Sequence, residues 1–136
     1  MTKIFPLAAV LATLLAGPAF AIDFEPSEDG SIEFDMPSGN MCCSYFGDAE
    51  GGPLLACTRV QPKYWIVHLR TDGEMTVYKK PGEVPGCGYG QPLGNVFTYG
   101  TTWNKSGFKC TSSTSGLKCT ANGVGFKLSK AGLVKY

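Results

Sequence analysis

Histidine, charged residues and long apolar runs are scarce in this sequence, and each scarcity excludes a class of function. The chain has 136 residues with one histidine, and only 17% of its residues are charged. A Ser-His-Asp or Cys-His catalytic arrangement would have to use His68, which we expect on the solvent side of a strand. After residue 21, no apolar stretch reaches the roughly 18 residues of a membrane span. We therefore expect no transmembrane segment in the mature chain.

The first 21 residues have the pattern of a secretory signal peptide. Lys3 supplies the positive start, residues 4–16 the apolar run, and Ala19-Phe20-Ala21 the small-x-small cleavage site. We predict a leader at 1–21, a single β domain at 22–136, and a soluble protein that is periplasmic or secreted. Loss of Lys3 reduces the 12 basic residues by one, so they equal the 11 acidic residues. This balance argues against electrostatically driven binding to nucleic acid or an anionic membrane.

The six cysteines predict three disulfides. An exported chain meets an oxidising compartment, and an even number of cysteines leaves none unpaired. No two of them have the C-x-x-C spacing of a zinc knuckle or a dithiol redox motif, so we expect no metal site and no catalytic cysteine. The cysteines are Cys42, Cys43, Cys57, Cys87, Cys110 and Cys119.

Local spacing narrows the disulfide pairing. Residues 108–111 and 117–120 flank a small-residue turn, and a hairpin there places Cys110 opposite Cys119. Cys42 and Cys43 are neighbours, and neighbours in a strand point to opposite faces, so they should have different partners. We favour Cys43 with Cys57 and Cys42 with Cys87. The reverse assignment of Cys42 and Cys43 stays open.

Short strands account for most of the mature sequence. Residues 31–36 alternate apolar and polar side chains, and residues 64–70 place Trp65, Val67 and Leu69 on one face. Ser129 is expected to cap a single turn through Lys130 and Ala131. No window shows sustained helical periodicity, which predicts an all-β fold: a small disulfide-stapled sandwich or barrel of short antiparallel strands. The strands are predicted at 31–36, 41–46, 54–60, 64–70, 75–79, 95–99, 101–105, 108–111, 117–120 and 125–129.

A long Gly- and Pro-rich loop is the first candidate for a binding surface. Residues 81–94 are too rich in these residues for regular structure, and Cys87 anchors them. Tyr89 lies in this loop, and Tyr99 and Trp103 follow it. Exposed aromatic side chains at loops are one way in which compact β domains bind glycans or extended peptides. Core packing is the alternative role for these aromatic residues.

Two stretches resemble a family of uncharacterised exported bacterial proteins, classed as a domain of unknown function. Residues 34–43, with the sequence FDMPSGNMCC, resemble its F-x-x-P-S-G-N-I-x-C opening. Tyr99-Gly100 and residues 107–130 resemble its Y-G, C-T-S, G-L-x-C-T-N and G-F-x-L-S-R closing pattern. Relatives often have C-H-G-D at the third-region cysteine, where this chain has Cys87-Gly88-Tyr89-Gly90, and a histidine in place of Val124. The resemblance implies an exported β fold and carries no known activity.

The remaining chemistry favours binding over catalysis. Asp48 and Glu50 share one turn, but two carboxylates without an Asp-rich loop are a weak calcium signal. No phosphate-binding or dinucleotide motif is present, and the 81–94 loop offers only Glu83 as a titratable group. We predict a non-enzymatic binding module without a cofactor, whose partner is an unidentified protein or glycan of the cell envelope and not a nucleic acid. The alternative is a small secreted hydrolase-type enzyme with an unrecognised site.

Overall fold

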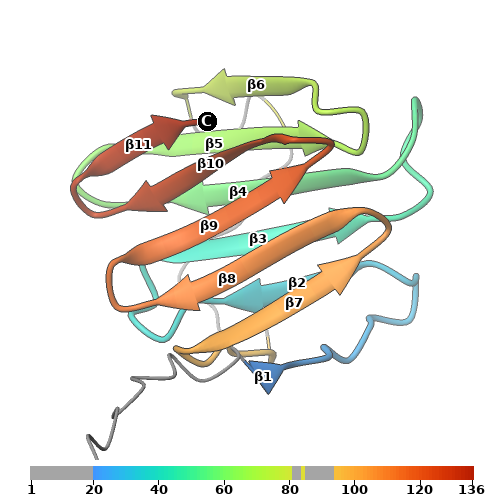
Figure 1. The fold of residues 1–136 in the computed structure, drawn as a ribbon, viewed down its shortest axis with the longest axis horizontal. Helices are drawn as coiled ribbons and strands as arrows, with labels where there is room; N and C mark the ends of the chain where they lie inside the picture. Colours follow the sequence, from blue (N-terminus) through green and yellow to red (C-terminus); the bar gives the residue numbers. More distant parts are fainter. Residues whose placement is uncertain (1–19, 81–83, 85–93) are drawn as a thin grey trace, which may run out of the picture.

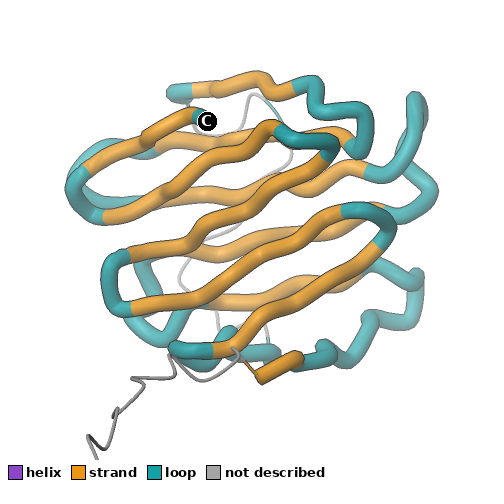
Figure 2. The backbone as a smooth tube through the Cα atoms, viewed as in Figure 1, coloured by secondary structure: helices purple, strands orange, loops and turns teal. Residues whose placement is uncertain are grey.

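The protein is a β-sandwich of two facing sheets (Figure 1). A computed structural model describes residues 20–80, 84 and 94–136. Figure 2 shows only strands and loops in this part of the chain, which contains no helix long and apolar enough to cross a membrane. The all-β prediction is confirmed, and the architecture is sandwich-like.

The first half of the chain forms the five-stranded sheet, which lies behind in Figure 1. Its strands follow one another in the order β2-β3-β4-β5-β6, and every neighbouring pair is antiparallel. The sheet is therefore a simple meander. The strands are β2 (Ile32–Asp35), β3 (Met41–Phe46), β4 (Leu54–Arg59), β5 (Trp65–Arg70) and β6 (Met75–Tyr78).

The second half of the chain forms the six-stranded sheet in front. Its order is β1-β7-β8-β9-β10-β11, and only the short edge strand β1 pairs in parallel. β1 consists of Phe20 and Ala21, the last two residues of the predicted leader. The strands are β1 (Phe20–Ala21), β7 (Thr101–Lys105), β8 (Phe108–Ser113), β9 (Gly116–Ala121), β10 (Val124–Ser129) and β11 (Gly132–Lys135).

Two local predictions are wrong. The strand expected at 95–99 is only an isolated bridge between Val96 and Asp35, because this segment must lead the chain from one sheet to the other. The turn expected to begin at Ser129 is a hairpin turn, in which Ser129 is the last residue of β10 and pairs with Gly132 of β11. Strand pairing on both sides leaves no room for a helical turn there.

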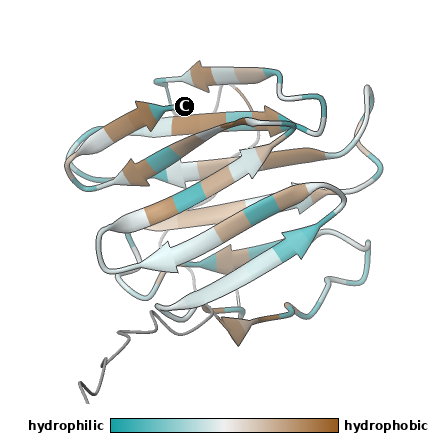
Figure 3. Cartoon of the chain, in the orientation of Figure 1, coloured by the Kyte–Doolittle hydropathy of each residue, from teal (hydrophilic) through white to brown (hydrophobic). Residues whose placement is uncertain are grey.

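Alternating side chains place a single core between the sheets, and Figure 3 shows this alternation as coloured bands along the strands. Aromatic rings cluster at the β2 edge of this core: Phe34 stacks on Phe24 with ring centroids 4.6 Å apart, and Phe97 meets Phe34 edge-on at 5.3 Å. All three side chains are buried. The core thus joins β2, the chain before it, and the crossover segment.

Two disulfides lie in this core, each between adjacent strands of one sheet. Cys43 of β3 is bonded to Cys57 of β4, and Cys110 of β8 to Cys119 of β9. Each pair is directly opposite in the antiparallel register, with Cα atoms 4.1 Å apart. Both predicted pairs are confirmed, which decides the alternative left open for Cys43. Cys42 is also disulfide-bonded, and its expected partner Cys87 lies outside the described residues.

Candidate functional site

A groove of about 500 Å³ lies at one end of the sandwich. The β8–β9 and β10–β11 turns of one sheet face the β2–β3 turn and the β4–β5 loop of the other, at the left end of Figure 1. These connections share one end because every second turn of a meander returns to the same side. The groove is lined by Ser38, Asn40, Met41, Gln61, Tyr99, Ser113, Thr114, Ser115, Gly116, Ser129, Lys130 and Ala131.

Asn40 joins the two connections that the five-stranded sheet contributes. Its Nδ2 donates to the carbonyl of Gln61 over 2.8 Å, and its Oδ1 accepts from the backbone N–H of Gln61 over 2.8 Å. Gly39, with φ of +74°, provides the left-handed turn that brings Asn40 into place. The side-chain amide of Asn40 thus holds this wall instead of facing a ligand.

Arg59 joins this wall to the opposite sheet. Its Nη1 donates to the carbonyls of Ser129 and Lys130 over 3.0 and 3.3 Å, while Nε and Nη2 donate to the carbonyl of Lys63. The guanidinium also lies 4.0 Å from the ring centroid of Trp65. Burial lowers the pKa of Arg59 from its ordinary value, yet an arginine remains charged at neutral pH. Arg59 therefore sets the position of the β10–β11 turn.

Tyr99 lines the groove from a turn whose backbone is held by hydrogen bonds. Gly100, with φ of +83°, follows it, and the backbone N–H of Gly100 donates to the carbonyl of Ser112 over 2.8 Å. The hydroxyl of Ser112 in turn donates to the carbonyl of Phe97 over 2.8 Å. The side chain of Tyr99 is 40% exposed. Its backbone is thus held on β8 while its ring stays accessible.

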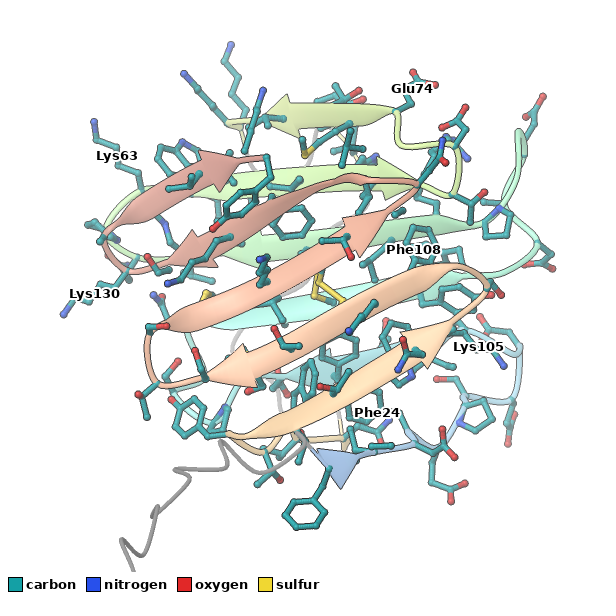
Figure 4. The ribbon with its side chains drawn as sticks, in the orientation of Figure 1. Phe24, Lys63, Glu74, Lys105, Phe108 and Lys130 are labelled. Carbon is teal, nitrogen blue, oxygen red and sulfur yellow. A yellow bond between two sulfur atoms is a disulfide. The ribbon has the colours of Figure 1, made fainter. Side chains whose placement is uncertain are left out.

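The described lining combines hydroxyl and amide groups with one ammonium and one aromatic ring, and none of these described residues carries a carboxylate or an imidazole. Two of its hydroxyls form a hydrogen bond with each other, since the Oγ atoms of Ser113 and Ser115 lie 2.8 Å apart. Gln61, Thr114 and Lys130 form no side-chain hydrogen bond to another described residue. Figure 4 shows Lys130 projecting at this end of the molecule. These groups are available to a polar ligand.

Trp103 does not belong to this surface, so its candidate role in binding is wrong and the alternative role, core packing, is confirmed. It is 1% exposed, and its ring lies 5.4 Å from that of Phe34 and 5.8 Å from that of Tyr45. Trp103 pairs with Cys110, which also points inward. Alternation along β7 shows which residues share a face, but only the facing sheet decides that this face is buried.

Of the other residues that the sequence singles out, His68, Asp48 and Glu50 are described and do not line the groove. Tyr89 and Glu83 lie outside the described residues, so the role of Tyr89 stays a prediction. His68 is half-buried, and its ring centroid lies 5.0 Å from that of Tyr78. Asp48 and Glu50 are exposed in the β3–β4 loop. Within the described residues, no three His, Cys, Asp or Glu side chains gather into a potential metal site.

Sequence reasoning found Tyr99 but missed the groove's polar residues. Ser38 and Asn40 belong to the P-S-G-N segment of the resemblance, while Ser129 and Lys130 belong to its closing L-S segment. These two motif segments line one groove only because the tertiary structure brings them together. The available signal was that both motifs place polar residues in turns.

Comparisons of the chain with family models, with curated proteins and with solved structures found no match. The resemblance to a family of exported proteins therefore stays a prediction, and the site must be interpreted from its own geometry.

Proposed function

We propose that this protein is a non-enzymatic binding module of the cell envelope or the extracellular space, and that the end groove binds a short neutral glycan. The observation that carries the proposal is the position of Tyr99. Its ring is accessible on a groove whose remaining polar groups are hydroxyls, amides and one ammonium. An aromatic face beside hydrogen-bonding groups matches the apolar and hydroxyl faces of a sugar ring.

The rigidity of the walls supports this function. Asn40 and Arg59 each join two separate connections through backbone carbonyls, so the groove exists before a ligand arrives. Preorganisation reduces the entropy lost on binding. The part of the lining that the structure describes holds no carboxylate or imidazole for acid–base work, which makes binding the better-supported function.

Binding of neutral oligosaccharides tests the proposal. We expect the oxidised protein to bind at least one member of a panel of glucose and N-acetylglucosamine oligosaccharides, measured by calorimetry. Tyr99→Ala should weaken that binding on the order of tenfold, since an aromatic contact contributes about 1 kcal/mol beyond area burial. It should leave the melting temperature nearly unchanged because Tyr99 is an exposed residue.

The matched control is Tyr136→Ala, which removes another exposed tyrosine, 54% accessible and outside the groove. This variant should bind the same oligosaccharide as the unaltered protein does. Failure of every neutral oligosaccharide to bind, or equal losses in the two variants, would overturn the proposal.

A further inference from the structure

The near-neutral net charge of the chain conceals an uneven distribution of its acidic residues. All 11 acidic residues lie between Asp23 and Glu83, while six lysines and no acidic residue lie between Val84 and Tyr136. Strands β7 to β11 belong to the second segment. The charged side chains of their sheet are therefore all positive, although basic and acidic residues are equal in number over residues 22–136.

The strand register brings three of these lysines to the outer face of the sheet. Cys110 and Cys119 point into the core, so their neighbours point outward. Lys109 on β8 and Lys118 on β9 are diagonal neighbours on this face, since Lys109 is opposite Thr120 and Lys118 is opposite Thr111. Diagonal neighbours lie about 7–8 Å apart. Lys127 of β10 is directly opposite Lys118.

A direct lysine pair is unfavourable in an isolated sheet. Like charges opposite each other on antiparallel strands repel, and an Asp or Glu at either position would remove the repulsion. None of the residues on β7 to β11 is acidic. The ammonium of Lys118 lies 4.7 Å from the ring centroid of Tyr136, which offsets part of this repulsion. A bound anion would neutralise the remainder.

Hydroxyl groups lie between the lysines. Lys109, Thr111, Lys118 and Thr120 surround a shallow hollow of about 190 Å³. The two lysines occupy one diagonal of this quadrilateral and the two threonines the other. The hollow thus offers ammonium groups and hydroxyls in alternation.

These features favour an anionic polysaccharide over other polyanions. The threonine hydroxyls can bond to sugar hydroxyls between the charged groups. Among the described residues, the exposed large apolar side chains of this sheet away from β1 are Val134 and Tyr136, both at the β11 edge. A membrane-inserting face would need more of them. A single-stranded nucleic acid stacks successive bases on several aromatic rings, whereas this face offers only Tyr136.

We propose that the outer face of β8, β9 and β10 binds an anionic polysaccharide through Lys109, Lys118 and Lys127, with Thr111 and Thr120 bonding to the sugar. This surface is separate from the end groove and its neutral ligand. The two proposals can fail independently.

The experiment compares two lysine pairs of equal charge. Binding of the oxidised protein to heparin, polygalacturonate and neutral dextran is measured by calorimetry at several salt concentrations. We expect binding to at least one of the two anionic polymers and none to dextran. The double variant Lys118→Gln/Lys127→Gln should weaken binding on the order of tenfold and reduce its salt dependence. Both lysines project from one face of the sheet, so the variant should fold, which thermal unfolding checks.

Lys79→Gln/Lys80→Gln is the matched control, because it removes the same charge after β6 of the other sheet. It should bind as the unaltered protein does, and so should Tyr99→Ala. Thr111→Val/Thr120→Val keeps every charge and should weaken polysaccharide binding about fivefold through lost hydrogen bonds. Absence of binding to both polyanions, equal losses from the two lysine pairs, or tighter binding to DNA or phosphatidylglycerol vesicles would overturn the proposal.

Discussion

Arg59 shows how one residue positions a site that it does not line. Its guanidinium is buried at 2% exposure, and its described partners are three backbone carbonyls and the ring of Trp65. Carbonyl oxygens carry partial negative charge, so they compensate part of the cost of burying the cation. The same bonds hold the β10–β11 turn against the β4–β5 loop.

Replacing Arg59 with methionine should therefore destabilise the fold. We expect Arg59→Met to lower the free energy of unfolding by about 2–4 kcal/mol, because it keeps the apolar stem but leaves the carbonyls of Lys63, Ser129 and Lys130 without their donor. Urea denaturation measures the change. Arg70→Met is the control: among the described residues, the side chain of Arg70 donates only to the carbonyl of Gly52, and its loss should cost about 1 kcal/mol. Equal losses would show that Arg59 has no special role.

At the scale of elements, β1 is the least anchored strand. It consists of two exposed residues, Phe20 and Ala21, paired with Thr101 and Thr102. The next residues are bound more firmly, since the backbone N–H of Ile22 donates to the carbonyl of Thr102 over 2.9 Å and Phe24 packs in the core. The predicted cleavage after Ala21 would thus remove β1 and spare these contacts.

A chain that begins at Ile22 should be almost as stable as the full chain. We expect the free energy of unfolding to change by less than about 0.5 kcal/mol, as for other exposed residues. A chain that begins at Glu25 also loses Phe24, which stacks on Phe34, and it should lose about 3 kcal/mol or more. Thermal unfolding of both chains provides the measurement. A large loss on removing residues 1–21 alone would contradict the assigned role of β1.

At the scale of the whole molecule, the two described disulfides each lie within one sheet, whereas the core packs both sheets together. The hydroxyls of Tyr45 and Ser106 also join the sheets, 2.6 Å apart. Because the sheets share a single core, neither should unfold alone.

The double variant Cys110→Ala/Cys119→Ala should unfold in one transition at lower urea. We expect a loss of about 2–5 kcal/mol, since the bridge no longer restricts the unfolded chain. Tryptophan fluorescence and far-ultraviolet circular dichroism should report coincident curves. The Cys43→Ala/Cys57→Ala variant should show a similar loss because its loop is only slightly longer, with a separation of 14 against 9 residues. Separate transitions for the two probes would show that the sheets unfold independently.

Local patterns in the sequence predicted most of the strands, most of the turns and the Cys110–Cys119 pair, and they favoured the Cys43–Cys57 pair. Alternation needs only neighbouring residues, and the hairpin that joins Cys110 to Cys119 closes over a short turn. Tyr99 could be selected because it follows the Gly- and Pro-rich loop, and exposed aromatic side chains at loops are one way in which compact β domains bind ligands.

Only the tertiary structure decided which faces are buried and which turns meet. Trp103 points inward because the other sheet covers that face, and alternation alone gives no such information. The groove combines Asn40, Gln61, Tyr99 and Lys130, which lie in separate connections and meet only when two meanders face each other. The outer face of β8, β9 and β10, with its three lysines, likewise depends on strand register, because strand pairing makes neighbours of charged residues that are separated in sequence.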